Sequence, residues 1–431
     1  MMNQKNSNSR QIAFEILKKI ILKGSFSNIL LNDVAQNKDL DQKEKNLIFV
    51  LVHGVVTWKI FLEYTTNKLI NKKKTPYEIQ IIIWMALYQL HFMDNIPQYA
   101  IVNEAVNLAK EVNPRFSGLV NGVLKNVIRQ TPEIYEVNEK NEEKKYCLEY
   151  GFPFLLYKLI KEGYGETEAK KVVKDSVKKP EINLRVNTLK ADFDDLYNEY
   201  KTEYGLKKQP EIKDCLISKK PIIATDLYRD GKITIQDKAS ILVGQTLNPS
   251  KDSRVLDMCS APGGKLTNLA AIMDNTGYIK AFELAKNRIG LIEQNIKRLG
   301  VTNVELVNGN ANLAIKDEQY DYILLDAPCS GFGVLKRKPE IKLNFQTNND
   351  TINTLYETQK ELIEVAYQSL KPNGEMVYST CTINESENQA RIQEFLKDHP
   401  DMEIISQTQL FGYEIDSDGF FICKLKKEGI I

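Results

Sequence analysis

Two cysteines and an aspartate follow apolar segments that have the composition of buried strands. One apolar run leads into Asp326, and Ala-Pro-Cys329 follows in a loop bounded by glycine. A second run, 376–380, leads into Cys381. In an open α/β sheet the ligand binds at the carboxyl ends of the strands, so two thiols and a carboxylate converge there if these strands are neighbours. A thiolate is a strong nucleophile, so the pattern predicts covalent catalysis by a cysteine.

A glycine-rich turn predicts a cofactor site. A strand-like run ends at Asp257, and the turn that contains Gly263 and Gly264 leads into a helix. Glycines let the backbone approach a ligand closely, and a helix N-terminus favours a negatively charged group. Glu283 ends the next strand, twenty residues beyond Gly263, where a carboxylate can accept hydrogen bonds from both hydroxyls of a ribose. We therefore expect an adenosine-type cofactor. The turn has neither G-x-G-x-x-G nor Walker spacing, which argues against NAD and ATP.

The remaining cysteines and the histidines do not form a recognisable site. The six cysteines are irregularly spaced, no C-x-x-C occurs, and the three histidines are scattered. We therefore expect no metal and no disulfide framework, and a reducing, cytoplasmic location. Cys147, Cys215 and Cys423 are expected to be buried and inert.

Strands and helices alternate from about residue 236 to 431, which predicts a Rossmann-like domain with a parallel sheet. The expected strands are 254–257, 277–282, 304–307, 320–326, 374–379 and 420–425. The expected helices are 265–273, 284–299, 353–369 and 386–398.

The first part of the chain has a different periodicity. Residues 1–132 repeat apolar side chains at helical spacing, over 10–21, 44–56, 61–69, 76–93, 100–110 and 117–129. Residues 133–145 are rich in glutamate and are expected to form a charged, mobile linker. Residues 146–235 mix both periods and predict a small α+β module. Its expected elements are helices at 154–162, 166–177 and 192–204 and a strand at 182–187.

Composition narrows the class of partner. The chain has 431 residues, 42% of them hydrophobic, and a formal net charge of +1. Residues 1–130 hold 17 Lys+Arg against 10 Asp+Glu, a net charge of +7. The whole chain has 58 Lys+Arg and 57 Asp+Glu, so the remaining residues carry a net charge of −6. A basic helical region suits a polyanion, although a solvated helical surface has the same composition. The most apolar run, 81–93, is shorter than the ~18–20 residues of a membrane span, and residues 1–10 do not have the pattern of a signal peptide.

These segments resemble a known enzyme family, the RNA 5-methylcytosine methyltransferases of the Sun (Fmu) family. The resemblance lies in Asp257-Met-Cys-Ser-Ala-Pro-Gly-Gly-Lys265, Asp326-Ala-Pro-Cys329-Ser-Gly and Ser379-Thr-Cys381-Thr. Three N-terminal segments are similar to a NusB domain: 86–97, 100–106 and 118–124. The resemblance covers nearly the whole chain. It implies an all-α NusB-like N-terminal domain, a small α+β middle module and a C-terminal α/β Rossmann-like methyltransferase domain.

The resemblance also implies a cofactor and its contacts. S-adenosylmethionine is expected over Cys259, Ser260, Ala261, Pro262, Gly263, Gly264 and Lys265. Glu283 would hold the ribose, and Asp326 would lie near the methionine end and the target base. The family usually has Asp in the Gly-x-Ala turn after the third strand, where this chain has Asn310. The amide oxygen can accept a hydrogen bond from the adenine amine without charge assistance, so we expect a modest loss of affinity.

The chemistry that the resemblance implies needs two cysteines. Cys381 would attack carbon 6 of a cytosine, which activates carbon 5 for methylation, and Asp326 would stabilise the adduct at ring nitrogen N3. Cys329 is implicated in releasing the product. The target base must be unstacked. The expected substrate is a specific cytosine of 16S (small-subunit) rRNA, naked or in early assembly, and the expected state is a monomer.

Three further residue predictions and two alternatives remain open. Lys72-Lys73-Lys74 and Arg115 are candidate contacts to the RNA backbone, and Arg185 is expected to face the RNA. The same chemistry on tRNA or another non-ribosomal RNA is one alternative. A NusB-like RNA-binding scaffold with an inactive methyltransferase fold is the other, and it predicts loss of catalytic residues, whereas Asp326, Cys329 and Cys381 are all present.

Overall fold

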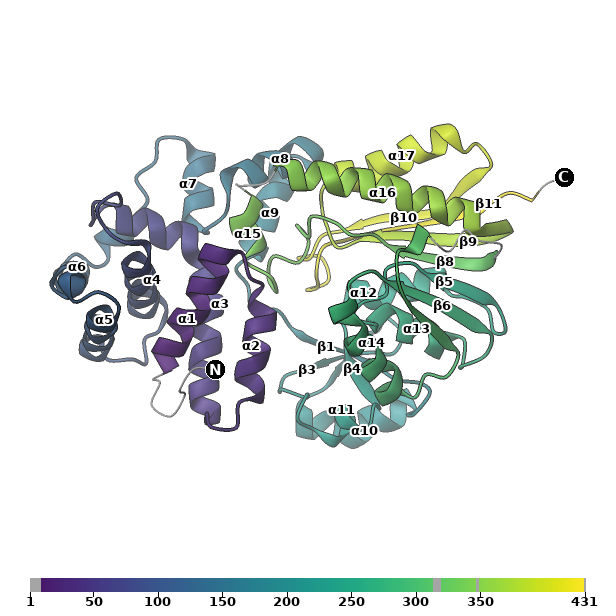
Figure 1. Cartoon of the computed structure of the whole chain (residues 1–431), viewed down its shortest axis with the longest axis horizontal. Coiled ribbons are helices and arrows are strands. Elements are labelled where there is room, and N and C mark those ends of the chain that lie inside the picture. Colours follow the sequence, from purple (N-terminus) through teal and green to yellow (C-terminus); the bar gives the residue numbers. More distant parts are fainter. Residues whose placement is uncertain (1–8, 313–318, 346–348, 430–431) are drawn as a thin grey trace. The chain divides into compact units, whose positions relative to one another are not determined.

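The computed structural model describes residues 9–312, 319–345 and 349–429, which fold into two compact units (Figure 1). The helical unit comprises Met1–Lys178 together with Leu335–Asn348. The sheet unit comprises Lys179–Val334 and Asn349–Ile431. The chain therefore leaves the helical unit, builds most of the sheet unit, and returns to the helical unit for one short segment.

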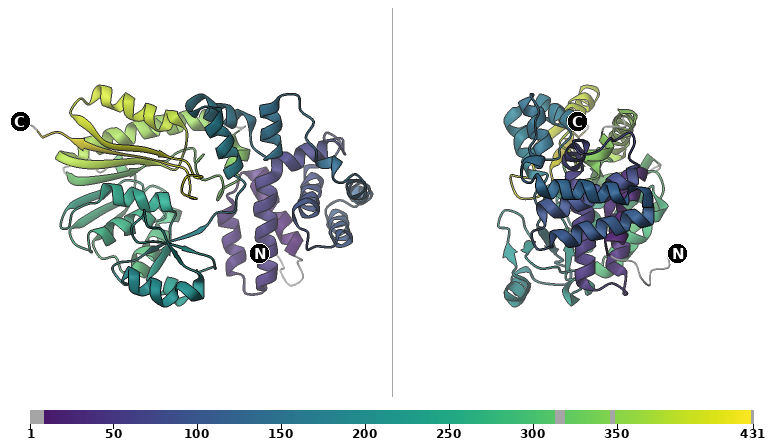
Figure 2. Two further views of the ribbon diagram at one scale, coloured as in Figure 1. Left: turned by 180° about the vertical axis from the view of Figure 1, so that it is seen from behind. Right: turned by 90° about the vertical axis from the view of Figure 1, so that its left-hand side faces the viewer.

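Six helices form the body of the helical unit: α1 (Ser9–Lys23), α2 (Ser27–Gln36), α3 (Gln42–Asn67), α4 (Tyr77–Phe92), α5 (Gln98–Val112) and α6 (Ser117–Arg129) (Figures 1 and 2). The predicted helices 44–56 and 61–69 are one continuous helix, α3, and α2 was not predicted. α3 begins with a capping box, in which the side chains of Asp41 and Glu44 each accept the backbone N–H of the other residue. α3 and α4 contribute more buried apolar residues to the core than any other two helices of this unit.

α3 is long and apolar enough to cross a membrane by length and composition, and it alone meets that test among the described residues. Half of its most apolar window is buried inside the protein. The helix packs against α1 and α4, and Leu51, Val55 and Leu62 are completely buried there. Its composition is therefore explained by its place in the core of the helical unit.

The glutamate-rich stretch 133–145 is packed against the helical unit, which differs from the predicted mobile linker. Ile134, Tyr135 and Val137 are buried in the same core as α3 and α4. α7 (Glu142–Glu149), α8 (Phe154–Tyr164) and α9 (Glu166–Asp175) then continue the helical unit. Three apolar side chains among the charged residues were enough to hold this stretch in place.

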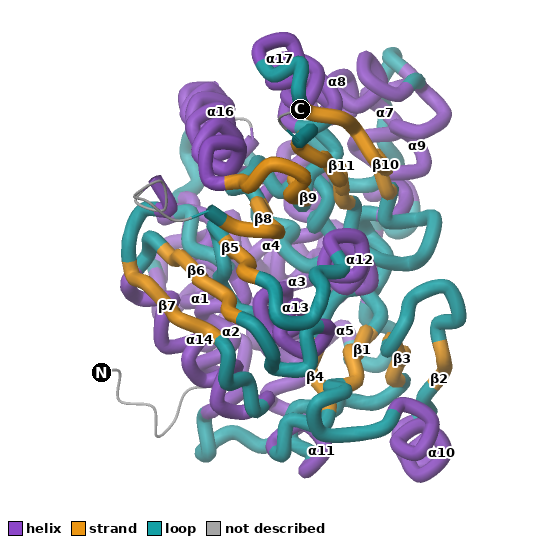
Figure 3. Tube along the Cα trace, turned by 90° about the vertical axis from the view of Figure 1, so that its right-hand side faces the viewer, coloured by secondary structure: helices purple, strands orange, loops and turns teal. Residues whose placement is uncertain are grey.

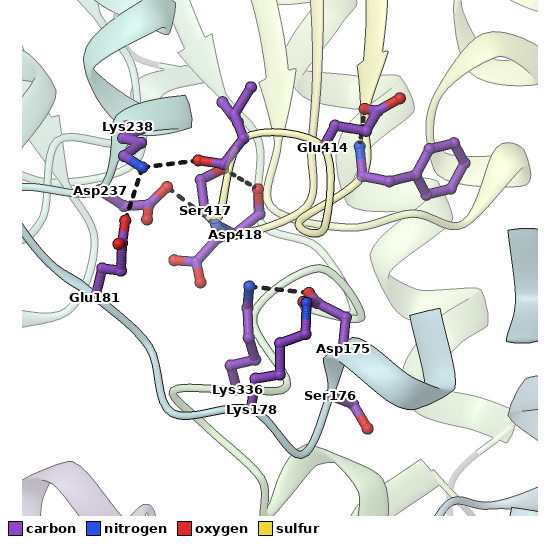
Figure 4. Close-up of polar contacts among 12 residues, drawn as sticks. Asp175, Ser176, Lys178, Glu181, Asp237, Lys238, Lys336, Glu414, Ser417 and Asp418 are labelled. Atoms are coloured by element: carbon purple, nitrogen blue, oxygen red, sulfur yellow. Dashed lines mark hydrogen bonds and ion pairs between the residues drawn. The ribbon is translucent and has the colours of Figure 1, made fainter. Parts of the chain in front are cut away.

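The returning segment Leu335–Phe345 is anchored to the helical unit by buried polar groups. Glu340 caps the start of α2, because its carboxylate accepts the backbone N–H of Ser27 at 3.1 Å and the hydroxyl of Ser27 at 3.0 Å. Nε2 of His53 lies 3.0 Å from the carbonyl oxygen of Lys336. The Lys336 ammonium forms an ion pair with Asp175 at 2.9 Å, with both side chains under 10% exposed (Figure 4).

A buried lysine completes this anchor. Lys342 lies in the short helix α15 (Ile341–Asn344) and donates a hydrogen bond to the carbonyl oxygen of Thr57 at 3.2 Å. Its ammonium lies 5.8 Å from the centre of the Phe152 ring. Burial lowers the pKa of Lys342 to about 7.

The predicted α+β module at 146–235 is divided between the two units. Its first helices belong to the helical unit, and the rest forms an antiparallel sheet of the order β2-β3-β1-β4 in the sheet unit. The strands are β1 (Ile182–Val186), β2 (Lys207–Lys208), β3 (Cys215–Ser218) and β4 (Ile233–Ile235), with helices α10 (Phe193–Tyr204) and α11 (Asp226–Arg229).

The larger sheet has the order β10-β11-β9-β8-β5-β6-β7 (Figure 3). Its strands are β5 (Arg254–Asp257), β6 (Tyr278–Glu283), β7 (Val304–Asn308), β8 (Tyr320–Asp326), β9 (Leu370–Thr380), β10 (Met402–Leu410) and β11 (Phe420–Lys427). The five strands from β5 to β9 are parallel, as predicted. β11 is antiparallel to β9 and to β10, so the parallel prediction does not extend to it, and β10 was not predicted.

Helices cover both faces of this sheet because strand residues alternate between two cores. Leu256, Ile323 and Met376 pack into one core with α16 (Asn349–Ser369) and α17 (Gln389–Asp398). Val255, Leu324 and Val377 pack into the other with α12 (Lys238–Leu247), α13 (Gly264–Ile272) and α14 (Lys286–Leu299). At the start of α12, Lys238 joins two distant segments of the sheet unit by binding Glu181 and the carbonyl oxygen of Ile415 (Figure 4).

Candidate active site

The strand order brings the predicted catalytic residues to one edge of the sheet. β8 lies between β5 and β9, so the carboxyl ends of these three strands are adjacent. Asp326 at the end of β8 is in register with Ser379 on β9. Cys329 follows β8, and Cys381 comes directly after β9. The convergence predicted from the sequence is therefore present.

The Asp326 carboxylate is held by two groups from different elements. Its Oδ1 accepts a hydrogen bond from the hydroxyl of Ser379 at 2.9 Å, and its Oδ2 lies 2.7 Å from Nζ of Lys265. Burial alone would lower the pKa of Lys265, but the charge of Asp326 and its hydrogen bond outweigh burial and raise this pKa. Lys265 therefore stays an ammonium, and it links the glycine-rich turn to the catalytic edge.

The two thiols are in direct contact. The sulfur atoms of Cys329 and Cys381 are 3.1 Å apart, which is a hydrogen-bond distance for thiols. The hydrogen bond with Cys381, together with burial, raises the pKa of Cys329 well above its ordinary value. Cys329 is therefore held as a thiol beside Cys381.

Two glycines allow the cysteine loops to approach each other. The N–H of Gly333 donates to the carbonyl oxygen of Cys381 at 3.0 Å, and the N–H of Gly419 donates to the carbonyl oxygen of Gly333 at 2.8 Å. A Cβ atom on Gly333 would lie 1.9 Å from the carbonyl oxygen of Gly419. No other residue type fits at Gly333 without moving the backbone beside Cys381.

The glycine-rich turn is fixed against the neighbouring strand. The N–H of Ser260 donates to the carbonyl oxygen of Phe282 at 3.0 Å, which ties the turn to β6. Gly263 has a φ of +96° at the start of α13, a conformation that side chains with a Cβ rarely adopt. Glu283 at the end of β6 is buried, and it accepts the N–H groups of Ala285 at 2.8 Å and Ala261 at 3.3 Å.

These residues fit the predicted adenosine-type cofactor. The Oδ2 atom of Asp257 is buried and has no hydrogen-bond partner among the described residues, so it is an unused acceptor at the end of β5. Burial, and then the charge of Asp326, raise the pKa of Asp257 to about 7. Leu284, next to Glu283, is 72% exposed and offers an apolar surface beside the carboxylate.

Asn310 lies just beyond the end of β7, at the same edge as Glu283 and the glycine-rich turn. Its side chain is exposed, and its Oδ1 accepts the N–H of Asn312 at 3.0 Å. A carbonyl oxygen has two lone pairs, so one remains for a ligand. The contact with adenine stays a prediction.

Arg185 does not face RNA, and that prediction is wrong. The side chain is 1% exposed, and it donates hydrogen bonds to Gln236 at 2.7 Å and to the hydroxyl of Thr267 at 2.9 Å. Thr267 in turn donates to the carbonyl oxygen of Gly263 at 2.8 Å. Burial lowers the pKa of Arg185 to about 9. Arg185 therefore stabilises the first turn of α13, the helix that follows the glycine-rich turn. The alternation of β1 predicted its strand but not which face is buried.

A buried carboxylate that the sequence pattern does not reveal lies beside the cysteine loops. Glu387 is 0% exposed and is surrounded by Ser330, Gln359 and Asn384. The signal was a polar run, Asn384-Glu-Ser-Glu387-Asn388, directly after a catalytic strand. Such a run is usually the exposed start of a helix, so its composition concealed a buried group.

The basic residues predicted to bind RNA lie on the surface of the helical unit. Lys72, Lys73, Lys74 and Arg115 are exposed, and Lys72 pairs with Glu63. Their contact with RNA stays a prediction. No group of three or more metal-ligand side chains occurs in residues 9–312, 319–345 and 349–429.

Comparisons with known proteins agree with this arrangement. Residues 244–426 match the family model of 16S rRNA methyltransferase RsmB/F, and residues 7–129 match the NusB family. The probable ribosomal RNA small subunit methyltransferase B of Bacillus subtilis is 33% identical, over 99% of this chain and 100% of the relative. Ribosomal RNA small subunit methyltransferase B of Klebsiella pneumoniae is 32% identical, over 98% of this chain and 99% of the relative.

Two solved structures are also similar. The crystal structure of PH0851 covers 99% of this chain with a TM-score of 0.81 and 23% identity, which shows a shared fold. A methyltransferase homologue from Pyrococcus horikoshii covers 67% of this chain and 100% of its own, with a TM-score of 0.60 and 29% identity.

Proposed function

Because the chain belongs to the RsmB/F family of 16S rRNA methyltransferases, we propose that it methylates carbon 5 of a cytosine in that RNA through a covalent bond to Cys381. S-adenosylmethionine is the proposed methyl donor. The observation that carries the proposal is the contact between the Cys329 and Cys381 thiols, 3.1 Å apart at the strand edge that also holds Asp326.

The two cysteines have different roles in this proposal. Carbon 5 of cytosine is a poor nucleophile, and attack of the Cys381 thiolate on carbon 6 turns the ring into an enamine that is nucleophilic at carbon 5. Asp326, fixed by Ser379 and Lys265, is placed to hold the proton at ring nitrogen N3 and so to stabilise the adduct. S-adenosylmethionine, when bound, supplies an electrophilic methyl group.

Product release requires a base. The proton on carbon 5 must leave before the bond between carbon 6 and Cys381 can break. Cys329 is the candidate, because its sulfur lies 3.1 Å from that of Cys381; it would accept this proton as a thiolate, after its own proton has passed to solvent. Glu283, the turn 259–265 and Asn310 hold the cofactor in this proposal, and Asp257 offers a further acceptor.

Replacement of Cys381 tests the nucleophile. Cys381→Ala is expected to lower the rate of methyl transfer by about 10⁴-fold or more, because the attacking atom is lost. Binding of S-adenosylmethionine, measured by calorimetry, should stay within about twofold, since the turn 259–265 is untouched. Retained turnover in Cys381→Ala would exclude its role as nucleophile.

Replacement of Cys329 tests the release step. Cys329→Ala is expected to accumulate a protein–RNA adduct that survives denaturing electrophoresis, because Cys381 can attack but the product cannot leave. The double variant Cys329→Ala/Cys381→Ala is the matched control and should give no adduct. Absence of the adduct in the single variant would reject the assignment of Cys329.

Bisulfite sequencing of total RNA with and without the protein distinguishes the possible substrates. A single protected cytosine in 16S rRNA is the expected result. Protection in tRNA instead would support the same chemistry on another RNA. The cytoplasmic location, the monomeric state and a naked or early-assembly rRNA substrate stay predictions.

A further inference from the structure

Glu387 accepts hydrogen bonds from four donors within the sheet unit. Its Oε2 accepts the N–H of Ser330 and the amide of Gln359, each at 2.9 Å. Its Oε1 accepts the amide of Asn384 at 2.9 Å and the hydroxyl of Ser330. A fully buried carboxylate is costly unless donors surround it, and these four donors offset that cost.

These donors come from both cysteine loops. Ser330 is the residue after Cys329, and its hydroxyl also lies 2.8 Å from the hydroxyl of Thr382, the residue after Cys381. The Oγ1 atom of Thr382 accepts the N–H of Asn384 at 3.2 Å. Gln359 also binds the Cys329 loop directly, because its amide donates to the carbonyl oxygen of Pro328 at 2.9 Å. The groups bound to Glu387 therefore flank Cys329 on both sides and reach the residue that follows Cys381.

We propose that Glu387 is a positioning residue that keeps the Cys329 loop and the Cys381 loop in register, so that both sulfur atoms lie close enough to act on the same base. This inference rests on the proposed function. The hydrogen bonds of Glu387 reach the cysteine loops through Ser330, Thr382 and Asn384, and its negative charge also helps to raise the pKa of Cys329.

Charge, and not size, makes Glu387 suitable. The four groups around the Glu387 carboxylate all donate hydrogen bonds to it. An amide in its place has only one acceptor oxygen, and its NH₂ group would face donors instead of acceptors. Glu387→Gln therefore keeps the volume of the side chain and disturbs the hydrogen bonds. Glu385, two residues earlier in the same turn, is exposed, and Glu385→Gln is the matched control for loss of one negative charge.

The first experiment measures catalysis. Glu387→Gln is expected to lower kcat by about 10- to 100-fold, the effect of losing hydrogen bonds to a charged group. The KM for RNA and the affinity for S-adenosylmethionine should stay within about twofold. Ser330→Ala should lower kcat less, and its effect should not add to that of Glu387→Gln in the double variant, because both act on one loop. A kcat of Glu387→Gln within twofold of Glu385→Gln, or additive effects, would overturn the proposal.

The second experiment does not depend on methyl transfer. The rate at which iodoacetamide alkylates Cys381, followed by peptide mass spectrometry from pH 6 to 10, reports whether the neighbouring thiol shares its proton. Glu387→Gln should shift this profile toward that of the Cys329→Ala variant, while Glu385→Gln should leave it unchanged. An unshifted profile would reject the positioning role. A shifted profile in a protein that methylates no RNA would uphold that role and reject the proposed function instead.

Discussion

At the scale of single residues, the two aspartates at the catalytic edge differ in their surroundings. Asp326 lies beside Lys265 and Ser379, whereas Asp257 is buried with one oxygen that has no hydrogen-bond partner among the described residues. Burial raises the pKa of Asp257 from its ordinary value of 3.8 to about 7. The folded protein therefore binds a proton that the unfolded chain releases between about pH 4 and pH 7.

This difference predicts a pH-dependent effect of Asp257→Asn. Because the folded state binds more protons than the unfolded state in this window, the contribution of Asp257 to stability is fully present below about pH 4 and is lost as the pH rises through 7. The variant should therefore gain stability relative to the wild type as the pH rises from 4 to 7. Denaturant unfolding of the wild type and the variant across this range measures the difference between their free energies of unfolding. A difference that does not change with pH would contradict the raised pKa of Asp257.

The residues with the strongest chemical signature were predictable from the sequence alone. Cysteines and an aspartate directly after apolar strands indicate a reactive site at the sheet edge, and the structure brings Asp326, Cys329 and Cys381 together. The sequence did not predict that Glu387 and Arg185 are buried, because burial of a charged group depends on partners far away in the sequence. Arg185 finds Thr267, and Glu387 finds Ser330, across intervals that no local pattern encodes.

At the scale of elements, the loop after β8 depends on a glycine for its path. Gly333 passes so close to Gly419 and to the backbone of Cys381 that a Cβ has no room. Gly333→Ala is therefore expected to displace the loop, and to lower kcat by at least about 10-fold and stability by about 1–3 kcal/mol.

Gly290 provides the control for this substitution. It lies in α14, and a Cβ there would meet nothing within 4 Å. Gly290→Ala should stabilise the protein by about 0.5–1 kcal/mol, since glycine is unfavourable inside a helix. Thermal unfolding and steady-state kinetics of the two variants make the comparison. Wild-type kcat in Gly333→Ala would show that the loop tolerates the displacement.

Elements with a clear period were predicted well, and those without one were missed. The central parallel strands β5, β6 and β8 match the predicted ranges to within one residue, because runs of apolar residues mark strands that are buried on both faces. β10 is an edge strand whose side chains are mostly exposed, so its sequence resembles a polar loop. α2 is only 10 residues long, and its first turn is capped by Glu340 from more than 300 residues away.

At the scale of the whole molecule, the helical unit is completed by a segment that lies between β8 and β9 in the sequence. Leu335 and Glu340 are buried in this unit, and Lys336 and Lys342 form buried contacts there. The domain boundaries expected from composition did not include this return, because composition does not reveal a contact between distant segments.

The return of the chain predicts complementation between fragments. Residues 1–178 alone should be less stable than the unit within the full chain, because Ser27 loses its cap and Asp175 loses Lys336. A synthetic peptide of residues 335–345 added in excess should raise the melting temperature of this fragment by binding the folded state. The control is the same peptide with Glu340→Gln and Lys336→Met, and equal effects of the two peptides would contradict the docking described here.

The returning segment also sets an order of events during synthesis of the protein. Leu335 is synthesised 157 residues after Lys178 (335 − 178) and therefore leaves the ribosome correspondingly later. At a translation rate of roughly 5–20 residues per second, the segment that completes the helical unit is made about 8–30 s after Lys178. During that interval the site for Glu340 and Lys342 stays open on the nascent chain, available to chaperones. The first unit to begin folding is thus finished only after β8 of the second has been made.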